Sequence, residues 1–176
     1  MRCPVIAFVI LAQLSLIGQA QEAQKPGKEH DVLKDMVGTW DAVVQMPGSP
    51  DSKALAIYTM SLEGMWLTSD FHGKIGEQKF HGKSFDSWDS AKKKYVGVWM
   101  DSMTGSPMVF EGNFDESGKT LVMHAESVGP DGKKSRFKST SVNSDANHHL
   151  YKMFMLNGDG SETEVMSIRY TRRTPG

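Results

Sequence analysis

Residues 94–101, Lys-Tyr-Val-Gly-Val-Trp-Met-Asp, contain the pattern that decides the fold. Side chains of a β-strand alternate between its two faces. Tyr95 and Trp99 therefore share one face, and Val96 and Val98 share the other. Several segments of this chain have such mixed faces, and a sheet with one apolar and one amphipathic face fits a closed barrel.

Short runs of β-branched, aromatic and Met residues continue along the chain after Gly38, separated by turn residues at regular intervals. Clear turn signals include Pro47-Gly48-Ser49-Pro50, Pro130-Asp131-Gly132 and Asn157-Gly158-Asp159-Gly160. Between the turns we predict about ten strands joined by hairpins. These strands cover roughly residues 39–46, 53–62, 65–72, 78–88, 94–101, 107–114, 119–127, 133–143, 147–156 and 162–172.

The predicted fold class is all-β: a single antiparallel meander β-barrel of about ten strands, lipocalin-like, with one short N-terminal helix. Closure is favoured because it leaves no exposed strand edge and encloses a partly polar interior. A sandwich of two sheets is the alternative. The hairpin connections along the whole chain favour the barrel.

The N-terminal residues are typical of an export signal. Arg2 precedes an apolar run over residues 5–17, and the small residues Gly18 and Ala20 provide an acceptable cleavage site. We predict a signal peptide over residues 1–20. The apolar run is shorter than the roughly 20 residues of a spanning helix, so a retained membrane anchor is the less favoured alternative. The mature protein is expected to be periplasmic or secreted by a bacterium, without membrane contact.

After this segment the chain divides into a tether and one domain. Residues 21–28 are polar and lack apolar periodicity, which predicts a flexible tether. From Glu29 to Val37 apolar residues recur at helical spacing, and Gly38 ends the run, so one short helix is expected here. A single lipocalin-like barrel domain over residues 29–176 is the predicted organisation, because about 150 residues is a usual size for one continuous core.

Composition excludes several kinds of chemistry. The only cysteine, Cys3, lies in the predicted signal peptide, so the mature chain is expected to have no disulfide and no cysteine-ligated metal. Without Arg2 the chain has 19 basic and 21 acidic side chains, a net charge of −2. No basic stripe dense enough to follow a phosphate backbone is present. Nucleic acid is therefore not an expected partner.

The junction of helix and first strand resembles the calycin superfamily of lipocalin-like barrels. Its members have a Gly-x-Trp motif, matched by Gly38 and Trp40, and a late arginine that packs across the tryptophan ring. Arg169 and Arg172 are the main candidates for that arginine, with Arg173 next to them. A guanidinium over an indole face is a favourable cation-π contact. The resemblance implies that these residues close one end of the barrel.

A second resemblance covers nearly the whole mature chain, to DUF1579, a bacterial family of unknown function. It implies a calycin-like fold, usually exported from bacteria, with no established activity and no catalytic residues to transfer. The matching segments are Gly38-Thr39-Trp40, Glu63-Gly64-Met65-Trp66-Leu67, Phe80-His81-Gly82-Lys83, Lys93-Lys94-Tyr95-Val96-Gly97-Val98-Trp99, Asp101-Ser102-Met103-Thr104, Glu111-Gly112, Gly118-Lys119-Thr120-Leu121 and Met166-Ser167-Ile168-Arg169-Tyr170-Thr171-Arg172.

Histidines raise the possibility of a metal or haem site. His148, His149 and His124 are the candidates, and the pair Asp70 and His72 could chelate from one strand face. No three ligands have a known zinc spacing, so no metal and no cofactor are predicted. Nitrobindins, ten-stranded barrels related to calycins, hold haem through one histidine near the C-terminal strands. That relationship keeps a haem protein using His148 or His149 as an alternative.

Tryptophan and methionine are abundant, and ordinary core packing is the favoured explanation for most of them, but a ten-strand barrel is also wide enough to hold a guest. Methionine is flexible and polarizable, so a Met-lined cavity adapts to irregular apolar molecules. The leading hypothesis is a binding protein rather than an enzyme, with a small, partly apolar ligand in the lumen and Arg169 as an anion anchor. A filled barrel that binds a partner on its surface is the other alternative, and the oligomeric state is left open. The predicted pocket residues are Trp66, Trp99, Phe110, Met123, Tyr151 and Arg169.

Overall fold

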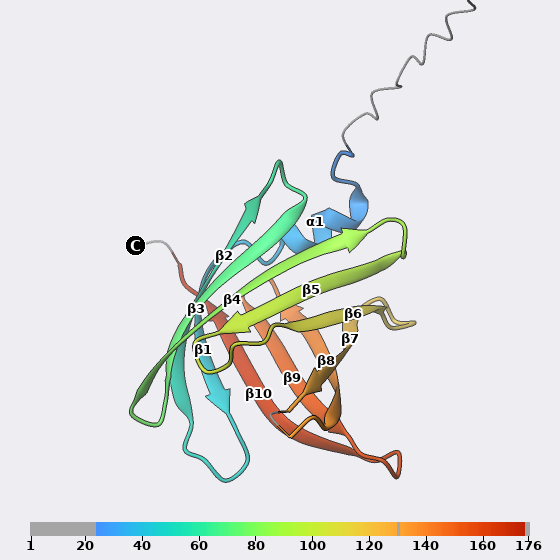
Figure 1. The fold of residues 1–176 in the computed structure, drawn as a ribbon. Helices are drawn as coiled ribbons and strands as arrows, with labels where there is room; N and C mark the ends of the chain where they lie inside the picture. Colours follow the sequence, from blue (N-terminus) through green and yellow to red (C-terminus); the bar gives the residue numbers. More distant parts are fainter. Residues whose placement is uncertain (1–23, 130, 175–176) are drawn as a thin grey trace, which may run out of the picture.

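The computed structural model describes residues 24–129 and 131–174, which form one short helix and ten strands (Figure 1). The predicted signal peptide over residues 1–20 and the first part of the tether lie outside this range. The elements are α1 (Lys28–Lys34), β1 (Gly38–Gln45), β2 (Ser52–Ser61), β3 (Trp66–Ile75), β4 (Gln78–Asp89), β5 (Lys94–Asp101), β6 (Met108–Phe114), β7 (Thr120–Val128), β8 (Lys134–Asp145), β9 (His148–Leu156) and β10 (Glu162–Arg172).

The strands form a closed antiparallel meander. Each strand pairs with the next one along the chain, and β1 closes the sheet against β10 from Trp40, opposite Arg172, to Gln45, opposite Ser167. The predicted barrel is confirmed, and the alternative of two stacked sheets is wrong. Closure pairs the edges of β1 and β10, so neither is left free to pair with another chain.

The helix covers one end of the barrel (Figure 1). It is shorter than predicted, because Met36 and Val37 donate their amides three residues back, to Leu33 and Lys34, in a tighter turn that leads into β1. Leu33 is buried against the barrel wall. In the part of the chain that is described, no helix is long and apolar enough to cross a membrane.

Trp40 and Arg172 close the helix-covered end. The Trp40 ring is 2% exposed, and its Nε1 donates to the Met36 carbonyl over 2.8 Å. The Arg172 guanidinium lies 4.0 Å from the ring centroid and also donates to the carbonyls of Asp35 and Val37. A Cβ at Gly38, whose φ is +137°, would collide with this guanidinium. The arrangement therefore needs glycine at that position.

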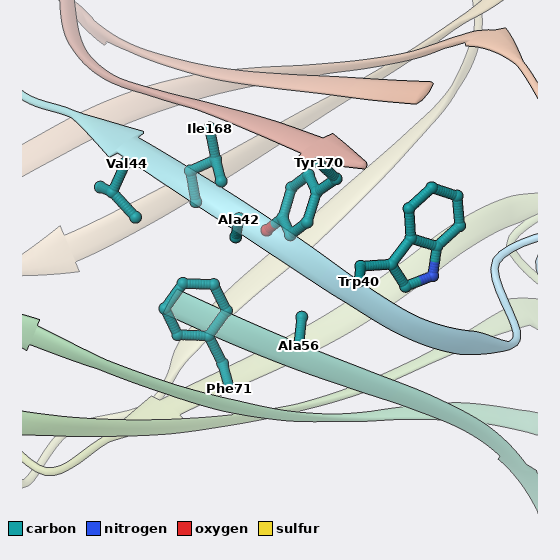
Figure 2. Packing of buried hydrophobic residues seen from close by; sticks show 7 residues of the cluster. All are labelled: Trp40, Ala42, Val44, Ala56, Phe71, Ile168 and Tyr170. Atoms are coloured by element: carbon teal, nitrogen blue, oxygen red, sulfur yellow. The ribbon is translucent and has the colours of Figure 1, made fainter. Parts of the chain in front are cut away.

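Apolar side chains from both ends of the chain meet inside the barrel. Figure 2 shows Ala42 and Val44 of β1 beside Ile168 and Tyr170 of β10, with Phe71 of β3 facing them. Alternation along each strand produces this inward set, as the burial pattern of β1 illustrates. The core is thus the lining of the lumen.

Candidate functional site

The barrel encloses a cavity of about 530 Å³. Hairpins alternate between the two ends of the barrel, so the end opposite α1 is bounded by the β1–β2, β3–β4, β5–β6, β7–β8 and β9–β10 connections. Met46, Ile75 and Met103, in or next to the first three of these, line the cavity. Ile75 and Met103 are also exposed, at 37% and 49%. This end, called here the mouth, gives the lumen an apolar rim.

An aromatic cluster forms the wall of the lumen near the mouth. Phe71, Phe80 and Trp99 pack with ring centroids 6.0 to 6.3 Å apart. The Trp99 ring lies against the backbone of Gly82, where any Cβ would overlap it. Trp99 Nε1 donates to Asp101 Oδ2 over 3.0 Å, so its polar atom is satisfied. The cluster therefore presents apolar surface to the lumen.

A short polar chain crosses this apolar lining deeper in the barrel. The Ser69 and Ser84 hydroxyls are 2.8 Å apart, and the Ser84 hydroxyl donates to Asp86 Oδ2 over 2.6 Å. All three side chains line the cavity. Asp86 pairs with Leu67 on β3 and with Gly97 on β5, close to the end that α1 covers. The carboxyl group therefore lies at the bottom of the lumen as seen from the mouth.

Asp86 has no positive partner among the described residues. Its side chain receives one hydrogen bond, from Ser84, and no lysine, arginine or histidine in that part of the chain pairs with it. Burial raises the pKa of Asp86 to about 6, and the Ser84 hydrogen bond opposes this shift only in part. At neutral pH the lumen therefore contains an uncompensated negative charge.

Tyrosines from β2, β9 and β10 surround the same region. Tyr58 and Tyr170 pack edge to face with centroids 6.4 Å apart. Burial raises the pKa of Tyr151 to about 12, and the charge on Asp86 adds to the shifts of both Tyr58 and Tyr151. These phenols therefore stay protonated and supply neutral hydroxyl groups near the carboxylate.

His149 is the inward-facing histidine of the pair on β9. Its Nδ1 lies 2.8 Å from Asn143 Oδ1, and its ring is tilted against Tyr170 at 5.2 Å. Burial lowers the pKa of His149 to about 4, so the ring is neutral at physiological pH. With Nδ1 as the donor to Asn143, Nε2 has a free lone pair and no hydrogen-bond partner among the described residues.

The predicted pocket residues divide into two groups. Trp99, Phe110, Met123 and Tyr151 line the cavity. Trp66 does not, because the inward residues of β3 have odd numbers, beginning with Leu67.

Arg169 was predicted wrongly, both as an anion anchor in the lumen and as a closing residue. Ile168 and Tyr170 on either side of it point inward, so Arg169 points outward, where it donates to Gln45 and lies 3.6 Å from Asp51. Arg172 closes the barrel end instead. It lies four residues after Ile168, and therefore on the same face of β10.

The three candidate metal ligands do not meet. His124 is exposed on the outer face of β7, and His148 pairs with Asp145 at the β8–β9 turn, while His149 faces the lumen. The fold instead gathers Asp70, His72 and His81 on the outer face of β3 and β4, with one donor atom of each within 4.8 Å of the others.

The sequence alone did not predict that Asp70, His72 and His81 lie together. His81 comes from the neighbouring strand, directly across from His72, so only the strand register reveals it. The carboxylate of Asp70 already accepts a hydrogen bond from Lys83 over 2.9 Å, and Lys74 and Lys79 lie farther along the same hairpin. These positive neighbours disfavour a metal cation there.

The residues that the sequence interpretation missed are the polar ones of the lumen. Ser69, Ser84, Asp86, Tyr58 and Tyr170 were not assigned to the pocket. A signal for Asp86 existed in the alternation of β4, which places it on the same face as Phe80 and Gly82.

Comparison with solved structures supports the fold. The "Crystal Structure of Rv2717c from M. tuberculosis" matches with a TM-score of 0.60 at 10% identity, covering 84% of this chain and 99% of that one. A redesigned β-barrel covers 86% of this chain and 100% of its own, with a TM-score of 0.44 and 10% identity. At such identities the likeness to Rv2717c shows the fold alone.

Comparison with sequences identifies the family. No curated protein matches this chain. Residues 25–172 match the family described as "Protein of unknown function (DUF1579)", which covers the helix and all ten strands. The chain therefore belongs to the DUF1579 family.

Proposed function

We propose that this chain is an exported binding protein whose barrel lumen holds a small, largely apolar molecule. The observation that supports the proposal is the cavity of about 530 Å³, lined mainly by apolar side chains with a few convergent polar groups. Ligand pockets in proteins have volumes of roughly 300–1,000 Å³ and the same mixture of wall chemistry. A filled barrel, the basis of the surface-interaction alternative, would lack such a space.

The shape of the lumen favours access from the mouth. At the opposite end α1 contributes Val32, Leu33 and Met36 to the lining, so that end is covered. At the mouth, the exposed Ile75 and Met103 offer apolar contacts to an arriving molecule. A guest would then pass the aromatic cluster before it reaches the polar groups around Asp86.

An environment-sensitive apolar dye tests lumen binding directly. Met108 lines the cavity at the start of β6, and its neighbour Val109 points outward and is 50% exposed. The variants Met108→Trp and Val109→Trp therefore add the same bulk inside and outside one strand. We expect dye binding to weaken about tenfold in Met108→Trp, in line with the 1–3 kcal/mol of overpacking, and to stay unchanged in Val109→Trp. Equal affinities in both variants would place the dye elsewhere and refute the proposal.

Export is part of the proposal and rests on the N-terminal pattern of Arg2, an apolar run and small residues before position 21. Intact-mass measurement of protein recovered from its own host tests it. A chain that begins near Gln21 in the periplasmic or secreted fraction supports export, and a full-length chain in the cytoplasm overturns it.

A second candidate function is haem or metal binding through His149. The neutral ring, with Nδ1 held by Asn143 and Nε2 free, is how a ligating histidine is usually oriented. His148 beside it faces outward and offers a matched control. Titration with hemin should produce a Soret shift that His149→Ala removes and His148→Ala keeps. A spectrum equal to that of free hemin would exclude this candidate.

A further inference from the structure

We propose that the guest of the lumen carries a positively charged nitrogen, such as a primary or secondary ammonium group, that pairs with the carboxylate of Asp86. This inference rests on the proposed function and specifies the chemical class of its ligand. It concerns a small cationic amphiphile: an apolar body with one ammonium head.

Among the described residues, no cation compensates the negative charge of Asp86. A carboxylate inside an apolar cavity is expensive unless a cation or several hydrogen bonds stabilise it. Asp86 receives one hydrogen bond, from Ser84 to Oδ2, and Oδ1 accepts none from the described residues. A guest that brings a cation and N–H donors would supply both missing interactions.

A glycine on β5 makes room for the Asp86 carboxyl group inside the barrel. Gly97 lies across from Asp86 on β5, and a Cβ there would collide with Oδ1. Oδ1 of Asp86 therefore lies where a side chain at position 97 would begin, and Met123 forms the neighbouring wall. Ser84 fixes the other oxygen, so the carboxyl group is oriented with Oδ1 free.

Charged side chains line both ends of the lumen. Lys74 and Asp101 lie towards the mouth, and Asp101 already accepts hydrogen bonds from Trp99 and two backbone amides. Lys119 lies in the β6–β7 turn at the deep end, and neither lysine pairs with Asp86. Burial keeps the pKa of His149 at about 4, so it adds no positive charge at neutral pH. A negatively charged head group at the bottom of the lumen would be repelled by Asp86.

Aromatic side chains form much of the wall of the cavity. Tyr58, Tyr151 and Tyr170 line the same depth of the cavity as neutral phenols. Aromatic rings stabilise an ammonium group through cation-π contacts, and phenol oxygens can accept its remaining hydrogen bonds. Towards the mouth, Phe71, Phe80 and Trp99 provide apolar contacts for the body of the molecule. The lumen therefore places the Asp86 carboxylate among phenols deep in the barrel and a cluster of aromatic rings nearer the mouth.

The test compares three probes with the same apolar body: decylamine, decanol and decanoate. Calorimetric titration at neutral pH, below the aggregation concentration of each probe, gives the three affinities for the full-length mature protein. We expect decylamine to bind at least about tenfold more tightly than decanol, because a charge-assisted hydrogen bond contributes that much or more, and decanoate to bind most weakly.

Two variants test whether Asp86 causes the preference for decylamine over decanol. In Asp86→Asn, decylamine and decanol should bind equally, whereas Glu77→Gln removes one negative charge from the exposed β3–β4 turn and should preserve the preference. Equal affinity of the three probes for the unmodified protein, or an amine preference that survives in Asp86→Asn, would overturn this inference and leave lumen binding intact. Failure of all three probes to bind would overturn the proposed function itself.

Discussion

Gly97 faces the carboxylate of Asp86 across the β4–β5 ladder, and a Cβ at this position would collide with Oδ1 while Ser84 holds Oδ2. The absence of a side chain at Gly97 thus allows an acidic group to lie inside the barrel. A glycine in the middle of a strand weakens the strand, and here its absent side chain leaves room for a buried acid.

Replacement of Gly97 by alanine tests this relationship. The new methyl group must push the Asp86 carboxylate away from Ser84, so Gly97→Ala should lower the free energy of unfolding by about 1–2 kcal/mol in urea denaturation. In the background of Asp86→Ala the same change should have little effect, since its collision partner is gone. Gly105→Ala, where nothing lies within 4 Å, is the control and should change stability by less than about 0.5 kcal/mol. Equal effects in both backgrounds would contradict the packing described.

Asp86 should make the stability depend on pH. Its pKa is about 6 in the folded chain and close to 3.8 when unfolded. Between these values the folded state holds a proton that the unfolded state has released, so the contribution of Asp86 to the free energy of unfolding falls as pH rises. The total loss is of the order of 3 kcal/mol. Asp86→Asn should therefore be more stable than the unmodified chain near pH 7, and an Asp86→Asn variant that is less stable at that pH would show that the carboxylate is compensated.

His149 should make the free energy of unfolding rise with pH, the opposite of the effect of Asp86. Its pKa is about 4 in the folded chain and near 6.5 when unfolded, so protons bind the unfolded state first as pH falls. Its contribution to stability is present above pH 6.5 and is lost as pH falls towards 4. His149→Gln should remove this acid sensitivity, while His148→Gln, on the outer face, should keep it. Stability profiles from urea denaturation between pH 4 and pH 7 measure the difference, and identical profiles for the two variants would contradict the burial of His149.

The closed end of the barrel predicts a large difference between two arginines of β10. Arg172→Lys loses the planar contact with Trp40 and several hydrogen bonds to carbonyls, and should lower the free energy of unfolding by about 2 kcal/mol. Arg169→Lys changes an exposed pair with Asp51 and should alter stability by at most about 0.5 kcal/mol. Comparable losses for the two variants would argue against the cation-π closure.

Much of the fold could be predicted from the sequence because its signals are local. Turn residues and alternation mark the strands, and the Gly-x-Trp motif marks the start of β1. The assignment of Arg169 failed for a different reason: which arginine covers Trp40 depends on the register between β1 and β10, and register is not a local property.

The interior chemistry was harder to predict. An acid within a strand normally points to solvent, so the alternation that places Asp86 on the face of Phe80 and Gly82 did not by itself identify that face of β4 as the inner one. The pairing of His72 with His81 likewise depends on two strands coming together. Trp99, Phe110, Met123 and Tyr151 could be placed in the lumen because apolar side chains on alternating positions favour the interior.

The lumen as a binding site can be observed with methionine methyl NMR. Met123, Met153 and Met166 line the cavity, whereas Met100 lies outward on β5 and is 41% exposed. Titration of methyl-labelled protein with decylamine should shift the signals of the three inward methionines and leave that of Met100 in place. Shifts confined to Met100 and other outward methyl groups, with the inward signals unchanged, would contradict binding inside the barrel.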